Sequence, residues 1–430
     1  MTRDTLGDAL ATGSLALVLA LSQAACGGTQ GELAPAPADS NAPAEWSAIA
    51  VKTVQDAAAV TPGGVSPMEE SRTYAMAFSA AHDALNAIDR RYKPYLSDLY
   101  APGADVGAAV ASAVTTVLES NLPSQSAALD AAYTVALARV PEGSAKADGV
   151  ALGRRTAQAI IAARSGDGSA NAQGAYVPAQ TPGAYQFTPP FDFAAFVHWG
   201  EVKTFTIASG DQFRTAAPFV LSDPGYSADF NEVKAIGEAH STTRTADQTQ
   251  IARFWLENTP LSWQRIAMRL AADRRLNDWD RMRLFALLQV AEADAYIASF
   301  DSKYFYCFWR PITAIRAAAT DGNPDTTADA TWSSLEPAPP IPDHASGHAA
   351  AAGAGAAVLE SLVPGSVRFS HQSASLPGVT RDFVSFAQAE QEIGVSGVYL
   401  GFHFRRAVSQ GLKQGRQVGR WALQHTMSPV

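Results

Sequence analysis

Two cations near the middle of the chain, Lys303 and Arg310, are separated by a run of aromatic residues (KYFYCFWRP). Seven residues are nearly two helical turns, so the spacing predicts that both side chains project from almost the same face. Arginine offers an oxyanion a planar fork of donors, and lysine adds a point charge. The aromatic run predicts low-dielectric surroundings, which strengthen charge interactions. The alternative is a surface lysine and arginine flanking a buried aromatic stripe.

A second segment, PDHASGH, is followed by four alanines and predicts the start of a helix. Free backbone N–H groups and the positive end of the helix dipole make such a start a ready anion site. Ser346 adds a hydroxyl donor, Gly347 lets an anion approach the backbone, and His348 is placed to transfer a proton. The alternative is an ordinary helix cap by Asp343 or Ser346, with the histidines on the surface.

A third segment, YLGFHFRR, places His403 between apolar residues shortly after a glycine. Taken by itself, a histidine in this setting is more often a hydrogen-bonded core residue than a ligand.

Together, the three segments resemble the vanadium haloperoxidase and type 2 phosphatidic acid phosphatase superfamily, in which Lys-x6-Arg-Pro precedes Ser-Gly-His and then Gly-x-His. Residues 76–95 and 285–315 also look like helices of its bacterial haloperoxidase-like branch. The resemblance covers roughly residues 46–425 and implies an all-α fold. We therefore expect a single large helical-bundle domain of the vanadium chloroperoxidase and acid phosphatase type.

The resemblance implies a role for each candidate residue. His348 is the general acid–base. His403 is the axial group, which coordinates vanadium in the peroxidases and forms a phosphohistidine in the phosphatases. Because vanadate with one axial histidine is five-coordinate, like the transition state of phosphoryl transfer, one set of donors fits both. Four residues bind the equatorial oxygens: Lys303, Arg310, Ser346 and Gly347.

The function implied is a vanadate-dependent haloperoxidase that oxidises halide with hydrogen peroxide. Bound vanadate acts as a Lewis acid on the peroxide, and His348 manages protons. A first alternative keeps the site and changes the substrate: an exported acid phosphatase that takes a phosphomonoester and uses His403 as nucleophile. A second alternative is a degenerate member that binds an oxyanion without turnover.

Three positions depart from the superfamily's pattern. Gly397 stands where a second anion-binding arginine is usual, and this supports the degenerate alternative. Ala407 stands where a carboxylate would orient His403, and Ala345 replaces a proline. His344, four residues before His348, has no carboxylate to complete a zinc-type motif, so we expect it to support the site or lie on the surface. Three arginines are candidates to replace the missing one: Arg405, Arg406 and Arg381.

Composition excludes some other functions. The chain has 430 residues, 47% of them hydrophobic, and a net charge of −9. Without a Lys/Arg stripe, nucleic acid is not an expected partner. Frequent alanine favours helix over sheet. Only Cys26 and Cys307 are present, so no disulfide is expected in the mature chain.

The N-terminus predicts export. Residues 1–26 combine Arg3 with an apolar stretch and small residues before Cys26, which indicates an export signal and a possible lipid anchor on that cysteine. Residues 27–45 have the Pro/Ala-rich composition of a linker, and the folded domain is expected at 46–430. The predicted location is the periplasm, the cell envelope or the medium, without a membrane span in the mature domain.

Helical periodicity predicts the elements that must position these residues. Residues 166–225 are rich in Pro, Gly and aromatics, and we expect them to be irregular and to form a wall of the site. Aromatics there and near Phe300 are expected to line the halide side. No strong strand alternation is present. The predicted helices are 67–91, 105–120, 124–140, 145–165, 226–275, 280–302, 311–319, 344–362, 380–396 and 404–425.

Overall fold

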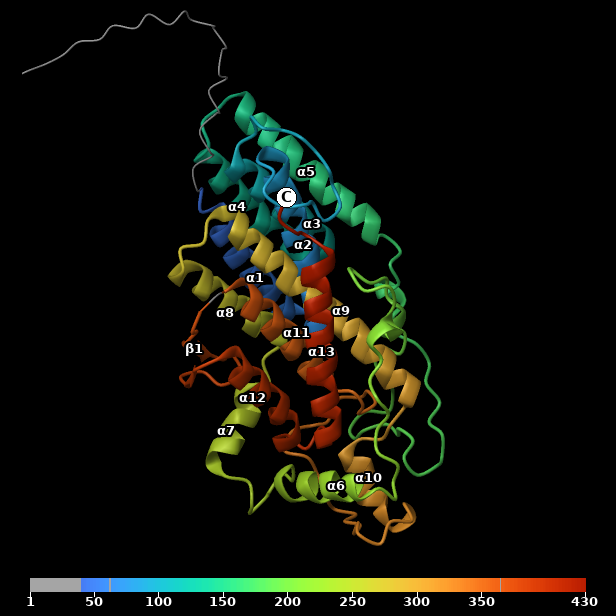
Figure 1. Cartoon of the computed structure of the whole chain (residues 1–430). Coiled ribbons are helices and arrows are strands. Elements are labelled where there is room, and N and C mark those ends of the chain that lie inside the picture. Colours follow the sequence, from blue (N-terminus) through green and yellow to red (C-terminus); the bar gives the residue numbers. More distant parts are fainter. Residues whose placement is uncertain (1–39, 62, 364) are drawn as a thin grey trace, which may run out of the picture. The chain divides into compact units, whose positions relative to one another are not determined.

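The computed structural model describes residues 40–61, 63–363 and 365–430, and its regular structure is almost entirely helical (Figure 1). The all-α prediction is confirmed. The predicted export signal, its Cys26 and most of the predicted linker lie outside these residues. Helix α1 begins at Ala42, four residues before the expected start of the domain. Within the described part of the chain, no helix is long and apolar enough to cross a membrane.

The α-helices are α1 (Ala42–Val60), α2 (Pro67–Ile88), α3 (Val106–Asn121), α4 (Ser126–Ala138), α5 (Ser144–Arg164), α6 (Pro224–Ile236), α7 (Ala246–Phe254), α8 (Thr259–Asp273), α9 (Asp278–Tyr306), α10 (Pro311–Ala317), α11 (Gly347–Leu362), α12 (Phe386–Tyr399) and α13 (Arg405–His425). The short 3-10 helices are η1 (Pro123–Gln125), η2 (Ser169–Asn171), η3 (Trp199–Glu201), η4 (Gly210–Phe213) and η5 (Ala318–Thr320). A hairpin pairs β1 (Phe369–Gln372) with β2 (Thr380–Phe383) in antiparallel register.

Most predicted helices are present, and local capping explains the exceptions. Helix α1 was not predicted. The predicted helix 226–275 is three helices, because Thr245 opens α7 with a capping box and Pro260 lies in the first turn of α8. The predicted helix 380–396 was wrong in its first residues, which form strand β2; α12 begins only after its cap, Ser385. Residues 166–225 contain only short 3-10 helices, as expected.

Helix α9 is the central element of the domain. Asn277 caps its start by accepting a hydrogen bond from the Asp280 amide. Most of its 29 residues are buried, because α2, α11 and α13 pack around it. A helix that is apolar around most of its circumference belongs in a core, and this one carries Lys303 in its last turn. The position of that lysine is therefore fixed by the packing of three other helices.

Helices α11 and α13 are held together by glycines, and Figure 1 shows them side by side. A Cβ at Gly415 would lie 1.8 Å from the Ala350 carbonyl oxygen, and one at Gly411 would lie 2.5 Å from the Ser346 carbonyl oxygen. Only glycine allows the backbones to approach this closely. The contact at Gly411 fixes the N-terminus of α11, and the Ser346 amide also donates to the Ala407 carbonyl (3.0 Å).

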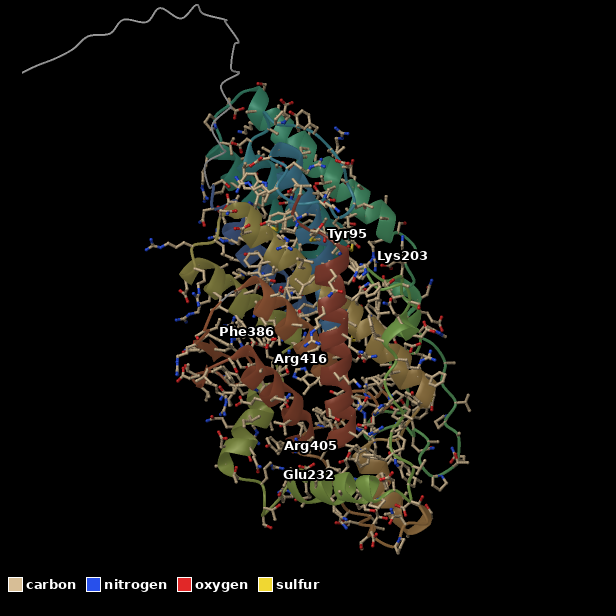
Figure 2. All side chains as sticks on the ribbon, in the orientation of Figure 1. Tyr95, Lys203, Glu232, Phe386, Arg405 and Arg416 are labelled. Atoms are coloured by element: carbon tan, nitrogen blue, oxygen red, sulfur yellow. The ribbon has the colours of Figure 1, made fainter. Side chains whose placement is uncertain are left out.

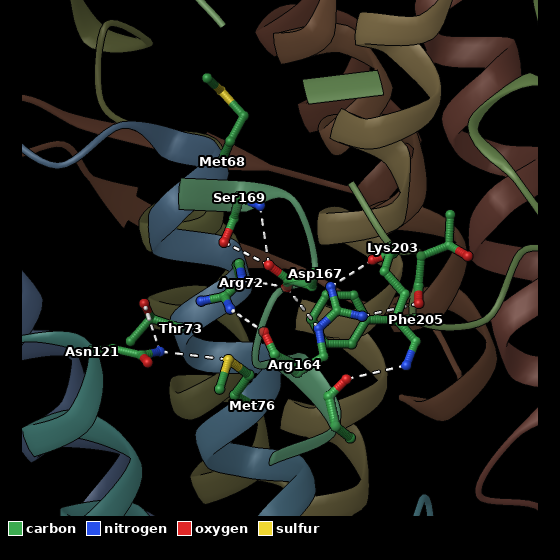
Figure 3. A network of polar contacts seen from close by, with 12 residues as sticks. Met68, Arg72, Thr73, Met76, Asn121, Arg164, Asp167, Ser169, Lys203 and Phe205 are labelled. Carbon is green, nitrogen blue, oxygen red and sulfur yellow. Dashed lines mark hydrogen bonds and ion pairs between the residues drawn. The ribbon is translucent and has the colours of Figure 1, made fainter. Parts of the chain in front are cut away.

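A buried polar network ties α2 to α5 and to the irregular segment (Figure 3). Asp167 accepts from Arg72 Nε (2.8 Å) and from Arg164 Nε (3.0 Å). Arg164 also donates to the carbonyls of Lys203 and Thr204. These charged groups are paired and hydrogen-bonded, which is the condition under which charge is tolerated in a core. The network anchors α2, whose first turn carries Met68 to the site.

Candidate active site

A cavity of about 280 Å³ lies where the C-terminal ends of α9 and α12 meet the N-terminal ends of α2 and α11. The structure brings five of the six predicted site residues to its lining: Lys303, Arg310, Gly347, His348 and His403. Another part of the lining, which we call the N-terminal lining, comes from earlier in the chain: Ser66, Pro67, Met68, Ala195, Phe196, Trp255, Leu256, Glu257 and Asn258. Phe300 and Phe196 both line the cavity, as expected for the aromatics of these two segments.

Lys303 and Arg310 meet for a different reason from the one predicted. The prediction of a shared helical face was wrong, because α9 ends at Tyr306 and Cys307 adopts a left-handed conformation (φ 45°). The chain reverses there, and α10 starts at Pro311 with Arg310 as its extended cap residue. The two cations therefore come from opposite sides of a bend.

Lys303 is buried (1% exposed) and is held by the loop before α11. Its Nζ donates to the carbonyls of Pro342 (2.8 Å) and Asp343 (3.0 Å), which leaves one of its three protons for a ligand. Burial, followed by the nearby charge of Arg310, lowers the pKa of this ammonium well below its ordinary value. A bound anion would restore the charged form.

Arg310 is fully buried, and one of its donors has no partner. Its Nε donates to the Ile341 carbonyl (2.7 Å) and its Nη1 to the Phe402 carbonyl (2.9 Å). Among the described residues, nothing accepts from Nη2. A buried guanidinium N–H without a partner costs free energy, so this atom indicates a place for an oxyanion.

The N-terminus of α11 supplies backbone donors. Ser346 is the cap residue: its Oγ accepts from the Ala349 amide at 3.3 Å, and its side chain does not line the cavity. The amides of Gly347 and His348 have no acceptor in the part of the chain that the structure describes. Two free N–H groups at the positive end of a helix dipole favour an anion.

His403 receives its orienting carboxylate from an unexpected place. Its Nδ1 lies 2.8 Å from Asp343 Oδ1, so Asp343 takes the role for which the sequence pattern has only Ala407. Burial, followed by the charges of Arg310 and Lys303, lowers the pKa of His403 well below its ordinary value. Burial raises the pKa of Asp343 to about 7, against the two cations. We take the imidazole as neutral, with Nδ1–H donating to Asp343 and Nε2 left as the basic nitrogen.

His348 lies in the first turn of α11 and faces the same cavity. Its Nδ1 is 2.7 Å from Thr259 Oγ1, and its Nε2 makes no hydrogen bond of normal geometry to a described residue, although the ring interacts with the Trp255 backbone. Burial lowers the pKa of His348 to about 4, so it is neutral at neutral pH. An imidazole with one nitrogen held by a hydroxyl and the other turned to a cavity is placed to pass a proton.

Gly397 leaves the site without a second arginine. None of the three candidate replacements lines the cavity. Arg405 pairs with Glu232 (Figure 2), Arg406 donates to the Ala217 carbonyl, and Arg381 pairs with Glu392 and Asp247. A Cβ at position 397 would lie 3.0 Å from His403 Cδ2, so the glycine makes room for the histidine ring.

His344 is buried rather than exposed, and it supports the site from outside the cavity. Its Nε2 lies 2.8 Å from the Ala216 carbonyl and 3.1 Å from Thr215 Oγ1. Because α11 begins only at Gly347, His344 and His348 do not share a helical face.

Sequence reasoning did not identify the roles of Asp343 and Thr259. Asp343 lies two residues before Ala345 in the segment PDHASGH, but the residue that it contacts, His403, lies 60 residues later in the chain. Thr259 contacts His348 across 89 residues. Neither contact leaves a periodic or spaced signal in the sequence. The only hint was an acidic residue within PDHASGH.

The residues present fit an oxyanion such as vanadate. The cavity offers the unpartnered Arg310 Nη2, the free Lys303 proton and two helix amides, all donors. It also offers the neutral His403 Nε2, a metal-ligand nitrogen, and Arg310 Nη1 lies 3.3 Å from that atom. Lys303 and Arg310 face one carboxylate, Asp343, and the carboxylate of Glu257 elsewhere in the lining is paired with Arg265 and His371, so the site favours negative charge.

Comparison with known proteins shows that this chain is similar to vanadium haloperoxidases. Residues 283–430 match the family model described as the VCPO second helical-bundle domain. The vanadium chloroperoxidase of Curvularia inaequalis is 29% identical over 189 residues, which are 36% of this chain and 30% of that protein. The chain thus matches less than a third of the length of that relative. The resemblance predicted from the three motifs is confirmed.

Solved structures show the same fold over most of the chain. A bacterial vanadium-dependent iodoperoxidase superposes with a TM-score of 0.77 at 24% identity, covering 90% of this chain and 97% of its own. The apo form of a bacterial vanadium-dependent chloroperoxidase gives a TM-score of 0.68 at 16% identity, covering 83% and 93%. The holo form of a bacterial vanadium-dependent chloroperoxidase gives a TM-score of 0.66 at 18% identity, and the match covers 90% of this chain and 95% of that one.

Proposed function

We propose that this chain, which is related to the vanadium haloperoxidases and has their fold, is a vanadate-dependent haloperoxidase that oxidises halide with hydrogen peroxide. The observation that carries the proposal is the pairing of a neutral His403, oriented by Asp343, with a cage of unpartnered anion donors in the same cavity. The similarity to a vanadium chloroperoxidase and a vanadium-dependent iodoperoxidase supports the cofactor and the reaction class.

The chain's own residues hold the cofactor and move a proton. Lys303, Arg310 and the α11 amides would hold the oxygens of vanadate, and His403 Nε2 would be its protein ligand. Vanadate held in this way acts as a Lewis acid on hydrogen peroxide. His348 Nε2, which makes no hydrogen bond of normal geometry to a described residue, holds the proton that leaves with the product oxygen. Because fixed donors surround the developing charge, little reorganisation is needed.

The apolar lining controls what reaches the anion site. Phe196, Phe300 and Met68 line the cavity beside the charged residues. Apolar walls limit water and lower the local dielectric, which strengthens the hold of the cations on an anion. A halide is small and weakly hydrated enough to enter such a cavity, whereas a bulky charged ester must lose more solvation.

One observation favours the phosphatase alternative: the oriented His403 Nε2 is also suited to attack phosphorus. Gly397, which removes a cation that would otherwise face the oxyanion, favours the degenerate member instead. A phosphomonoester is the substrate of the phosphatase alternative. We further propose, from the N-terminal pattern, that the protein is exported.

The test is bromide-dependent halogenation of a phenol indicator by the protein from residue 27 onward, with hydrogen peroxide and with or without orthovanadate. We expect activity only with vanadate, and none in His403→Ala. Glu232→Gln, at a surface ion pair, is the control and should behave as wild type. Bound vanadate without halogenation, together with a phosphohistidine trapped from a phosphomonoester, would establish the phosphatase instead. Neither binding nor turnover would leave the degenerate member.

A further inference from the structure

Two buried glutamates lie directly behind the cavity, on facing helices. Glu70 on α2 is 2% exposed and Glu292 on α9 is fully buried. Each is followed four residues later by a buried tyrosine, Tyr74 and Tyr296, and this spacing puts each pair on one face of its helix. Helices α2 and α9 pack against each other, so the two Glu-x3-Tyr pairs meet between them.

These four side chains carry polar atoms that make no hydrogen bond of normal geometry to a described residue, although Tyr74 interacts with Glu70 and Tyr296 with Thr259. They are Glu70 Oε1, both carboxyl oxygens of Glu292 and the hydroxyls of Tyr74 and Tyr296. In protein cores nearly all polar groups are hydrogen-bonded, and groups without a protein partner are commonly satisfied by internal water. Several such atoms gathered between two helices therefore form a buried polar cluster.

This polar cluster adjoins the part of the active site that contains His348. Tyr296 lines the cavity, and a Cβ on Gly347 would lie 3.5 Å from its ring. Asn258, also in the cavity lining, donates from Nδ2 to Glu70 Oε2 (2.8 Å). The next residue, Thr259, contacts His348 Nδ1.

The two carboxyls are suited to store protons. Burial raises the pKa of Glu70 to about 7, although Asn258 and Tyr74 oppose the shift. Burial, and then the charge of Glu70, raises the pKa of Glu292 well above its ordinary value. Two carboxylates in one low-dielectric space cannot both ionise without a cation, and none faces them. Glu257 is the other acidic group near them and His348 the nearest base.

We propose that Glu70 and Glu292, together with Tyr74, Tyr296 and internal water, form a proton reservoir that reloads His348 through Thr259. The inference rests on the proposed function for its demand for protons, since oxidation of a halide by peroxide consumes one. His348 is neutral at neutral pH, so it can give up its Nε2 proton only if Nδ1 receives another.

The transfer balances without any change in electron count. His348 Nε2–H breaks as its proton goes to the product oxygen, and Thr259 Oγ–H breaks as its proton goes to His348 Nδ1. Thr259 then takes a proton from water or the Tyr296 hydroxyl, and that group takes one from the Glu292 carboxyl. Glu292 is left as a carboxylate. When His348 Nε2 takes a proton from solvent in the cavity, the Nδ1 proton returns through Thr259 to Glu292, and the starting state is restored. Glu70 and Glu292 never touch the substrate and act through His348.

The first test changes the link. Thr259→Val keeps the shape but removes the hydroxyl, and we expect kcat for bromide oxidation to fall about tenfold or more, with an unchanged KM for peroxide. Thr259→Ser keeps the hydroxyl and should retain most of the activity. Glu292→Gln should lower kcat and remove the decline of kcat with rising pH, while the surface variant Glu232→Gln should alter neither. A Thr259→Val protein with the wild-type kcat and pH profile would overturn the relay.

The second test does not depend on turnover. Infrared spectra of the vanadate-free protein should show a protonated-carboxyl band that persists at neutral pH and weakens in Glu292→Gln. Absence of that band at neutral pH in the wild type would overturn the reservoir. If Glu292→Gln does not fold, Glu70→Gln serves the same comparison. A wild type that fails to oxidise halide but keeps the band would sink the proposed function and leave the reservoir standing.

Discussion

At the scale of single residues, Asp343 determines what His403 can do. Its carboxylate lies 2.8 Å from Nδ1 and fixes the tautomer in which Nε2 is basic. A carboxylate in this position takes part in ligand binding although it does not touch the ligand.

Asp343→Asn should therefore weaken the binding of orthovanadate by about 10–100-fold, the usual loss when the partner of a ligating histidine is changed. Titration calorimetry measures this directly. Asp382→Asn, at an exposed Ser370 contact on the hairpin, should bind like the wild type. Equal affinity in Asp343→Asn and wild type would show that the histidine does not depend on this carboxylate.

Any side chain at position 397 should weaken vanadate binding, although an arginine there would add an anion-binding charge. Because a Cβ there would lie 3.0 Å from His403 Cδ2, even Gly397→Ala should push the ring. Overpacking of this kind costs about 1–3 kcal/mol, and we expect it to appear as weaker vanadate binding. Gly397→Arg adds the same clash together with a charge. If Gly397→Ala binds vanadate as tightly as wild type, the ring has room to move and the added charge can be judged by itself.

At the scale of elements, the anion site depends on how closely α11 and α13 approach. Gly415→Ala would place a Cβ 1.8 Å from the Ala350 carbonyl, which no rotamer change relieves. We expect the free energy of unfolding to fall by about 3 kcal/mol, measured by urea denaturation, with loss of vanadate binding as the α11 N-terminus moves. The exposed α13 change Gln417→Ala should stay within about 0.5 kcal/mol of wild type. A stable Gly415→Ala protein would contradict the close packing.

Helices α2 and α9 confer a pH dependence on stability. Glu70 has its pKa raised from 4.5 to about 7 in the folded protein, so the folded state holds a proton that the unfolded state has lost. Below about pH 4.5 both states are protonated, and the group has no effect. Between pH 4.5 and 7 Glu70 ionises only in the unfolded state, which stabilises that state relative to the folded one. The free energy of unfolding should therefore fall by about 3 kcal/mol across this range because of this group. Urea midpoints across that range should show the decline, and it should be smaller in Glu70→Gln.

The sequence predicted features that neighbouring residues determine, and it did not predict those that depend on contacts between residues far apart in the chain. Ser346 and Pro311 mark helix starts by local chemistry: α10 begins at Pro311 as predicted, and α11 begins at Gly347, three residues after the predicted start of helix 344–362. The meeting of Lys303 and Arg310 was predicted for the wrong reason, because nothing local announces the left-handed Cys307. The hairpin strand at 380–383 carries no clear alternation, and its pairing with β1 is set by a partner outside it. Asp343 and Thr259 act across the fold, where sequence spacing gives no information.

At the scale of the whole molecule, ligand binding should be visible as stability. A ligand at a hundred times its Kd adds about 2.7 kcal/mol to the free energy of unfolding if it binds only the folded state. Orthovanadate, and inorganic phosphate at higher concentration, should therefore raise the Tm of the protein from residue 27 onward, as followed by calorimetry. Lys303→Met should fold but lose this shift. A Tm that responds to neither anion would mean that the cage does not bind one.

The origin of the N-terminal lining has a further consequence for how such a protein can change. Every donor that we propose for the anion comes from residues 283–430, the region that matches the family model, while Met68, Phe196 and Trp255 come from outside it. The two sets meet only in the folded cavity. Substrate choice can thus change in evolution, or be redesigned, by exchanging only the segments that supply the N-terminal lining. The proposed anion-binding donors would stay unchanged.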